Sequence, residues 1–176
     1  MSAGEEARGL VLVNTGPGKG KTTAALGAAL RAAGNGWPVL IVQFIKNRDT
    51  GELRALGNVP GVEIRQMGRG LIIGRRPDEE DRRAAAEAWT VVRDAAASGR
   101  YKMIVLDEIG PALKLGLVDL SQVLDFLRHK PGALHLVLTG RDCPEDVLAA
   151  ADTVTRMESV KHHLAAGIKA QPGIEY

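Results

Sequence analysis

The sequence has few aromatic residues, one cysteine and almost no net charge. Phe, Trp and Tyr make up only 3% of its 176 residues, so a core must be built mainly from Leu, Val, Ile and Ala. The single cysteine, Cys143, excludes an internal disulfide and is typical of a reducing, cytoplasmic compartment. With 23 basic and 21 acidic residues, the net charge of +2 gives no electrostatic reason to expect nucleic acid or a membrane as a partner. No apolar run approaches the ~20 residues of a membrane span.

Short apolar runs alternate with longer segments of helical pattern over a length that fits one domain, residues 1–176. Strands are predicted at 10–14, 38–45, 62–67, 103–106, 134–139 and 153–157, and helices at 21–33, 78–97, 120–129 and 144–151. The apolar runs lack strict alternation, which favours strands buried on both faces. The sequence therefore predicts a single α/β domain, a mostly parallel sheet with helices on both faces, and a ligand site at the carboxyl ends of the strands.

A glycine-rich segment, NTGPGKGKTT at 14–23, lies between the first strand and the first helix. Glycines let the backbone wrap closely around phosphate oxygens, and the helix N-terminus adds its positive end. Lys21 reaches the outer phosphates and Thr22 offers a hydroxyl to Mg²⁺, while Thr15 stands where this motif usually has its first glycine. The segment predicts a phosphate-binding loop, a P-loop, whose candidate residues are Gly16, Pro17, Gly18, Lys19, Gly20, Lys21, Thr22 and Thr23.

Acidic and basic side chains follow two further strands. Asp107 and Glu108 come directly after the run at 103–106, where a carboxylate can hold Mg²⁺ beside a phosphate loop. The two would point to opposite faces if the strand continued, so spacing alone leaves open which one binds the metal. Arg141 follows the strand at 134–139, and either a phosphate contact or a surface salt bridge would explain it.

Other polar residues fit structural roles. His162 and His163 have no Cys or further His at metal-site spacing, so a polar loop is expected there. Cys143 has no base beside it in the sequence and is interpreted as a partly buried structural thiol. Residues 69–77 hold two Gly, a Pro and three Arg, and are the best candidate for a mobile loop.

Six segments together resemble one family along nearly the whole chain. They are GKGKTTAALG at 18–27, QFIK at 43–46, VLDE at 105–108, ALKLG at 112–116, LTGR at 138–141 and the ending KHH…AGIKAQPGIEY at 161–176. This set is similar to the P-loop ATP:corrinoid adenosyltransferases of cobalamin biosynthesis, the cob(I)yrinic acid a,c-diamide adenosyltransferases.

The resemblance implies a transferase in which Co(I) of a reduced corrinoid attacks the 5′-carbon of ATP and tripolyphosphate leaves whole. It implies that residues 16–22 hold the triphosphate, that Thr22 and Glu108 coordinate Mg²⁺ with support from Asp107, and that Lys21 is catalytic together with Thr22 and Glu108. Gln43, Lys46 and Arg141 lie in matching segments. A homodimer and a flavin-dependent reductant protein are further implied partners.

Two segments depart from the family pattern. Leu71, Ile72 and Ile73 stand where Phe and Trp usually cover the lower face of the corrinoid, and Ile109-Gly110-Pro111 replaces a segment with an Asn. Both concern the placement of the corrinoid rather than of the nucleotide. Arg75 and Arg76 are open to two interpretations, contact with corrinoid or phosphate groups and plain surface exposure.

Two other functions remain open on the sequence. The P-loop and the acidic pair also suit a small-molecule kinase or NTPase, with the Arg-rich segment 69–83 as a lid. The loss of aromatics at 71–73 suits a nucleotide-dependent corrinoid-binding protein without turnover.

Overall fold

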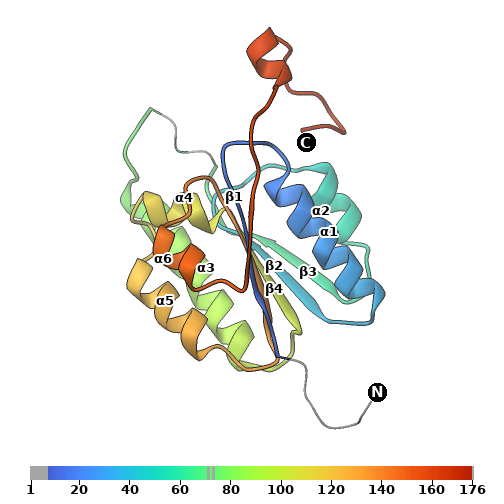
Figure 1. Cartoon of the computed structure of the whole chain (residues 1–176), viewed down its shortest axis with the longest axis vertical. Helices are drawn as coiled ribbons and strands as arrows, with labels where there is room; N and C mark the ends of the chain where they lie inside the picture. Colours follow the sequence, from blue (N-terminus) through green and yellow to red (C-terminus); the bar gives the residue numbers. More distant parts are fainter. Residues whose placement is uncertain (1–7, 71, 73, 176) are drawn as a thin grey trace.

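The computed structural model describes residues 8–70, 72 and 74–175, and a six-stranded sheet forms its centre (Figure 1). The strands are β1 (Val11–Thr15), β2 (Val39–Gln43), β3 (Val62–Gln66), β4 (Met103–Asp107), β5 (His135–Thr139) and β6 (Thr153–Arg156). Their spatial order is β3-β2-β4-β5-β1-β6, and every neighbouring pair is parallel. The predicted α/β fold is confirmed.

Burial differs strongly across the sheet. Every residue of β2 and β4 is buried, which explains why these strands read as continuous apolar runs rather than as an alternating pattern. All four residues of β6 are exposed, and this strand forms one edge of the sheet. The chemistry-bearing residues that follow β4 therefore start from a well-covered, rigid part of the molecule.

Helices cover both faces of the sheet, as predicted (Figure 1). They are α1 (Lys21–Gly34), α2 (Gly51–Leu56), α3 (Glu79–Ala97), α4 (Ile109–Lys114), α5 (Leu120–His129), α6 (Glu145–Ala149) and a short 3-10 helix, η1 (His163–Ala166). One apolar cluster contains the alanines of α1 and Leu56 of α2, and the other contains side chains of α3, α4, α5 and α6. No helix within the described ranges is both long and apolar enough to span a membrane.

The elements α2, α4 and η1 were not predicted from the sequence. In α4, Gly110 and Pro111 resemble loop residues, but Pro111 lies in the first turn, where its missing N–H is not needed. Gly110 is required by packing, because a Cβ there would come within 2.8 Å of Cys143 Sγ. The predicted strand at 38–45 was too long, since β2 ends at Gln43.

Candidate active site

The loop between β1 and α1 has the backbone geometry of a phosphate loop. Gly16 and Gly20 adopt φ values of 96° and 111°, in the left-handed region that favours glycine. The Lys21 ammonium group donates to the carbonyl oxygens of Gly16 (2.8 Å) and Gly18 (2.5 Å). Burial, and then the nearby Arg141, lowers the pKa of Lys21. Lys21 is thus held inside the loop, in surroundings where a bound anion would favour its charged form.

The glycines of this loop also serve the C-terminal part of the chain. A Cβ on Gly16 would lie 2.5 Å from the carbonyl oxygen of Met157, and one on Gly18 would lie 2.6 Å from that of Glu158. The Gly18 N–H donates to the Met157 carbonyl oxygen at 2.7 Å. The loop is therefore packed against the segment that follows β6, a contact that the sequence did not predict.

Asp107, at the end of β4, contacts four polar side chains from three segments of the chain. Its Oδ1 accepts hydrogen bonds from the hydroxyls of Thr22 (2.8 Å) and Thr139 (2.7 Å). Its Oδ2 accepts from Gln43 Nε2 at 3.0 Å and lies 3.2 Å from Lys46 Nζ. Asp107 is fully buried, so these contacts hold its carboxylate in one place beside the first turn of α1.

Glu108 has left the strand and starts α4. Its backbone is in the left-handed region (φ 63°), and its N–H donates to Thr139 Oγ1 at 2.9 Å. Because β4 ends at Asp107, the predicted opposite-face arrangement of a continuing strand does not apply. Burial, and then the neighbouring Asp107, raises the pKa of Glu108. Its Oε2 is buried with no hydrogen-bond partner among the described residues, an arrangement suited to a cation.

Lys46 connects this carboxylate cluster to α2. Its Nζ lies 3.5 Å from Glu52 Oε1 as well as 3.2 Å from Asp107. Burial alone would lower the pKa of Lys46, but the charge of Asp107 raises it overall. The ammonium group therefore stays protonated and offsets part of the negative charge that Asp107 and Glu108 bring into the site.

Most of the predicted site residues lie together at the carboxyl end of the sheet. Thr22 and Gln43 both donate hydrogen bonds to Asp107, and Glu108 follows Asp107 in the chain. Lys21 precedes Thr22 and donates to carbonyl oxygens of the phosphate loop. Lys19 differs, because its ammonium donates to the Ile174 carbonyl oxygen (2.8 Å) and pairs with Glu175 (2.9 Å). Pro17, Thr23 and Arg141 are exposed.

Sequence reasoning missed Thr139, which contacts both acidic residues. In the sequence, Thr139 is a polar residue at the end of the apolar run of β5, whereas Arg141, two positions later, was the residue predicted for the site. β5 lies between β1 and β4 in the sheet, so a side chain at its end stands between the phosphate loop and the acidic pair. Cys143 is buried, which raises the pKa of its thiol, and it behaves as the predicted structural residue.

The segments that depart from the family pattern are partly described. Ile72 is half-buried and packs against the larger apolar cluster, whereas Leu71 and Ile73 lie outside the described residues. Arg75 does not stand alone on the surface, because it pairs with Asp81 and with Asp78.

A strand, a glycine-rich loop, a helix and a buried carboxylate on a nearby parallel strand define a P-loop nucleotide-binding protein. Residues 7–176 match the family model described as ATP:corrinoid adenosyltransferase BtuR/CobO/CobP. The chain belongs to this family.

Named relatives support this membership over the full length of this chain. The chain is 38% identical over 176 residues to the corrinoid adenosyltransferase of Escherichia coli (strain K12), covering 100% of this chain and 90% of the relative. It is 39% identical over 176 residues to corrinoid adenosyltransferase CobA of Salmonella typhimurium, with the same coverage. A corrinoid adenosyltransferase of Sinorhizobium is 38% identical over 180 residues, which is 100% of this chain and 84% of the relative.

Proposed function

We propose that this chain transfers the 5′-deoxyadenosyl group of ATP to the Co(I) centre of a corrinoid and releases the three phosphates together as tripolyphosphate. Family membership supports the transfer. The observation that carries the assignment of the site is the direct link between the phosphate loop and the acidic pair, the hydrogen bond from Thr22 to Asp107. We propose that the chain works as a single domain.

The residues present suit Mg²⁺. This ion prefers hard oxygen ligands, and Thr22, Asp107 and Glu108 offer a hydroxyl and two carboxylates close together. The unpartnered, buried Oε2 of Glu108 is the atom that most needs a cation. We propose Thr22 and Glu108 as ligands, with Asp107 supporting them. When bound, Mg²⁺ supplies positive charge against the triphosphate.

The proposed reaction requires little general acid or base catalysis from the protein. Both electrons of the new cobalt–carbon bond come from Co(I), and the broken carbon–oxygen bond leaves its pair on the triphosphate. The protein must bind that highly charged leaving group and align it with the corrinoid. Residues 16–23 provide backbone N–H groups and the end of the α1 dipole, and Lys21 adds a fixed cation.

Three other side chains have proposed supporting roles. Gln43 is fully buried against Asp107, and its Oε1 has no hydrogen-bond partner in the described part of the chain. Lys46 balances the charge of the acidic pair. Arg141 lies near enough to Lys21 to lower its pKa, so a triphosphate held by Lys21 is within the electrostatic reach of Arg141.

Several expectations remain predictions. They are a homodimer, a flavin-dependent protein that supplies the reduced corrinoid, and a cytoplasmic location. The corrinoid would meet aliphatic side chains such as that of Ile72 in place of rings, and these side chains can still exclude water from cobalt, though less completely than rings.

Product analysis tests the proposed reaction. The chain is incubated without oxygen with ATP, Mg²⁺ and a chemically reduced corrinoid. The expected products are a light-sensitive adenosylcorrinoid and tripolyphosphate in equal amounts. ADP or orthophosphate formed in step with turnover, without a cobalt–carbon product, would identify a kinase or NTPase instead. Tight corrinoid binding with no product would identify a binding protein.

A further inference from the structure

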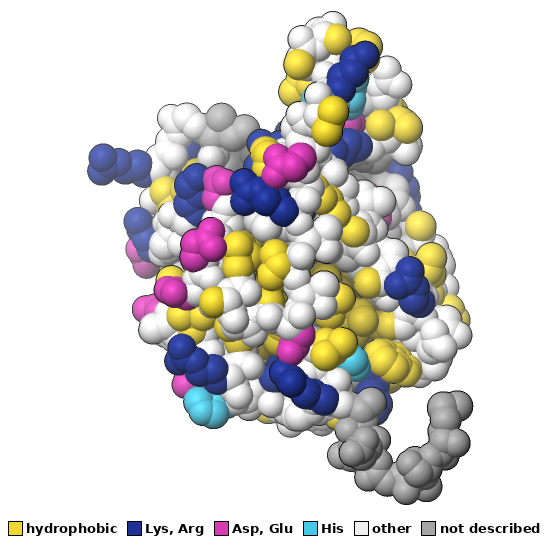
Figure 2. Space-filling view, in the orientation of Figure 1, with side chains coloured by type: hydrophobic (Ala, Val, Ile, Leu, Met, Phe, Trp, Pro, Cys, Tyr) yellow, Lys and Arg dark blue, Asp and Glu magenta, His cyan; other side chains and the backbone are white. Residues whose placement is uncertain are grey.

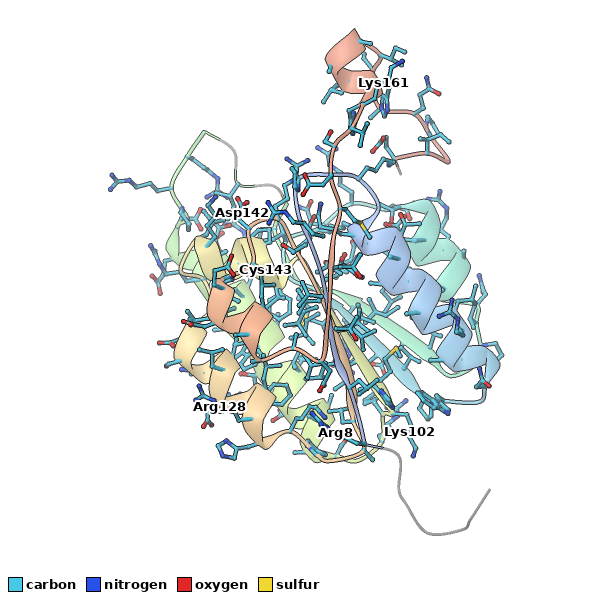
Figure 3. The ribbon with its side chains drawn as sticks, in the orientation of Figure 1. Arg8, Lys102, Arg128, Asp142, Cys143 and Lys161 are labelled. Carbon is cyan, nitrogen blue, oxygen red and sulfur yellow. The ribbon has the colours of Figure 1, made fainter. Side chains whose placement is uncertain are left out.

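The C-terminal segment, residues 157–175, folds back on itself beyond the sheet. The chain leaves β6 at Arg156, passes the phosphate loop, forms η1 and returns so that Glu175 lies near His163 (Figures 1 and 3). In the space-filling view this segment stands out at one end of the molecule (Figure 2). The turn brings two adjacent histidines and a carboxylate together, although Glu175 is 12 residues from His163 in the sequence.

The side chains of His162, His163 and Glu175 form a compact cluster. Their potential ligand atoms all lie within 4.8 Å of one another, and the two imidazole rings have centroids 4.6 Å apart. His163 Nε2 is 3.3 Å from Glu175 Oε1. That Oε1 is buried and forms no hydrogen bond among the described residues, so the contact with His163 leaves it unsatisfied.

The two oxygens of the Glu175 carboxylate have different partners. Lys19 holds the other carboxylate oxygen of Glu175, at 2.9 Å, and this contact lowers the pKa of Glu175. Oε1 of the same carboxylate lies on the side of the two imidazoles, 3.3 Å from His163 Nε2. His162 Nδ1 accepts a long hydrogen bond of 3.2 Å from the Leu164 N–H. Among the described residues, this is the hydrogen bond that the ring would lose on binding a metal through Nδ1.

We propose that His162, His163 and Glu175 form a binding site for a transition-metal ion of the Zn²⁺ type. Two imidazole nitrogens and one carboxylate oxygen are a common ligand set for Zn²⁺, with water as the fourth ligand. This nitrogen-rich set differs from the oxygen ligands at Asp107 and Glu108, which select Mg²⁺. The metal would hold the fold-back of the C-terminal segment together, and Glu175 of that segment also pairs with Lys19 of the phosphate loop.

Titration of the metal-stripped full chain tests this site. Co²⁺ is added as a spectroscopic substitute for Zn²⁺, and Zn²⁺ affinity is measured by competition with a coloured chelator. Excess Mg²⁺ is present so that the oxygen site does not take up the added ion. One equivalent of Zn²⁺ is expected to bind, and one equivalent of Co²⁺ is expected to give visible absorption bands. Neither ATP nor a corrinoid is needed.

The variants His162→Ala, His163→Ala and Glu175→Gln are each expected to weaken binding by at least 10-fold. His129→Ala is the matched control, because His129 is an exposed histidine on α5 that pairs with Asp125 far from the cluster. Asp107→Asn is expected to keep the Zn²⁺ site. Circular dichroism verifies that each variant is folded. The proposal is overturned if the parent chain binds no Zn²⁺, if the three variants bind as well as the parent, or if His129→Ala or Asp107→Asn loses the ion.

Discussion

At the scale of residues, the Asp107 carboxylate is fixed before any ligand arrives. Thr22 and Thr139 donate to its Oδ1, and Gln43 donates to its Oδ2. A buried charge is tolerated only when it is fully paired, and these contacts supply the pairing. Preorganised groups of this kind need no rearrangement when the triphosphate binds, which is how such sites lower a barrier.

Thr139→Val removes the hydroxyl that joins Asp107 to the Glu108 backbone while keeping the shape of the side chain. We expect the Mg²⁺ concentration for half-maximal activity to rise roughly 10-fold. The free energy of unfolding should fall by about 1–3 kcal/mol, because two buried polar groups lose a partner. Thr139→Ser keeps the hydroxyl and should restore both quantities. If Val and Ser behave alike, the hydroxyl does not position the acidic pair.

Lys21→Ala removes the cation held inside the phosphate loop. We expect adenosyl transfer to fall by roughly 100-fold or more, because the charge of the leaving group is no longer neutralised. Corrinoid binding should change little, since Lys21 serves the nucleotide. Single-turnover rates and corrinoid titration by absorbance measure the two effects. Arg31→Ala, at an exposed position in the last turn of α1, is the control, and strong activity in Lys21→Ala would contradict the proposed role.

At the scale of elements, α3 shows how a loop can be tied to a helix N-terminus. Asp78 and Asp81 form a capping box, in which each side chain accepts from the backbone N–H of the other. Arg69 and Arg75 pair with these acids. Arg69 and Arg75, which lie in the candidate mobile loop, are therefore held by acidic partners at the start of α3.

Asp81→Asn tests this anchor through its pH dependence. Hydrogen bonds from Arg75 hold the pKa of Asp81 well below its ordinary value of 3.8. A depressed pKa stabilises the fold at pH values above the ordinary one and ceases to do so as the pH falls through the folded value. We expect a loss of about 1 kcal/mol at pH 7 that shrinks as the pH falls below about 4. Urea unfolding between pH 3 and 7 measures it.

Glu79→Gln is the matched control, since Glu79 lies in the same first turn but is 92% exposed. Its effect on the free energy of unfolding should be small, because the side chain is exposed and its ion pair with Arg82 is long, at 4.0 Å. A pH-independent loss in Asp81→Asn would mean that packing, rather than charge, accounts for the change.

At the scale of the whole molecule, the phosphate loop and the C-terminal segment are built against each other. Gly18 donates its N–H to Met157, and Lys19 holds Ile174 and Glu175. Residues about 140 to 156 positions apart thus meet at the phosphate loop. A substitution in the phosphate loop should therefore change the stability of the C-terminal segment, and the reverse, through these direct contacts rather than through the sheet.

Gly18→Ala places a methyl group 2.6 Å from the Glu158 carbonyl oxygen, where the backbone must move. We expect a loss of about 1–3 kcal/mol in the free energy of unfolding, and faster proteolysis of the C-terminal segment. Gly27→Ala is the control, because nothing lies within 4 Å of a Cβ there and alanine favours α1 by up to about 1 kcal/mol. Equal effects of the two substitutions would contradict the contact.

Local patterns in the sequence were enough to predict the fold and the position of the glycine-rich loop between β1 and α1. Apolar runs without alternation predicted buried parallel strands, and β2 and β4 have that burial. The glycine-rich segment before Lys21 predicted the loop. These features depend on neighbours in the chain, whose preferences can be read directly.

Only the tertiary structure decided which distant side chains meet. The parallel register pairs Gln43 with Asp107 and Leu106 with Leu138, and so places Thr139 beside the acidic pair. The fold-back of the C-terminal segment likewise sets Glu175 against Lys19 and His163. The few aromatic residues predicted a mainly aliphatic core. Neither the composition, the single cysteine nor the balanced charge predicted these contacts between distant residues. Strand order and register fix such contacts, and no local period in a sequence encodes them.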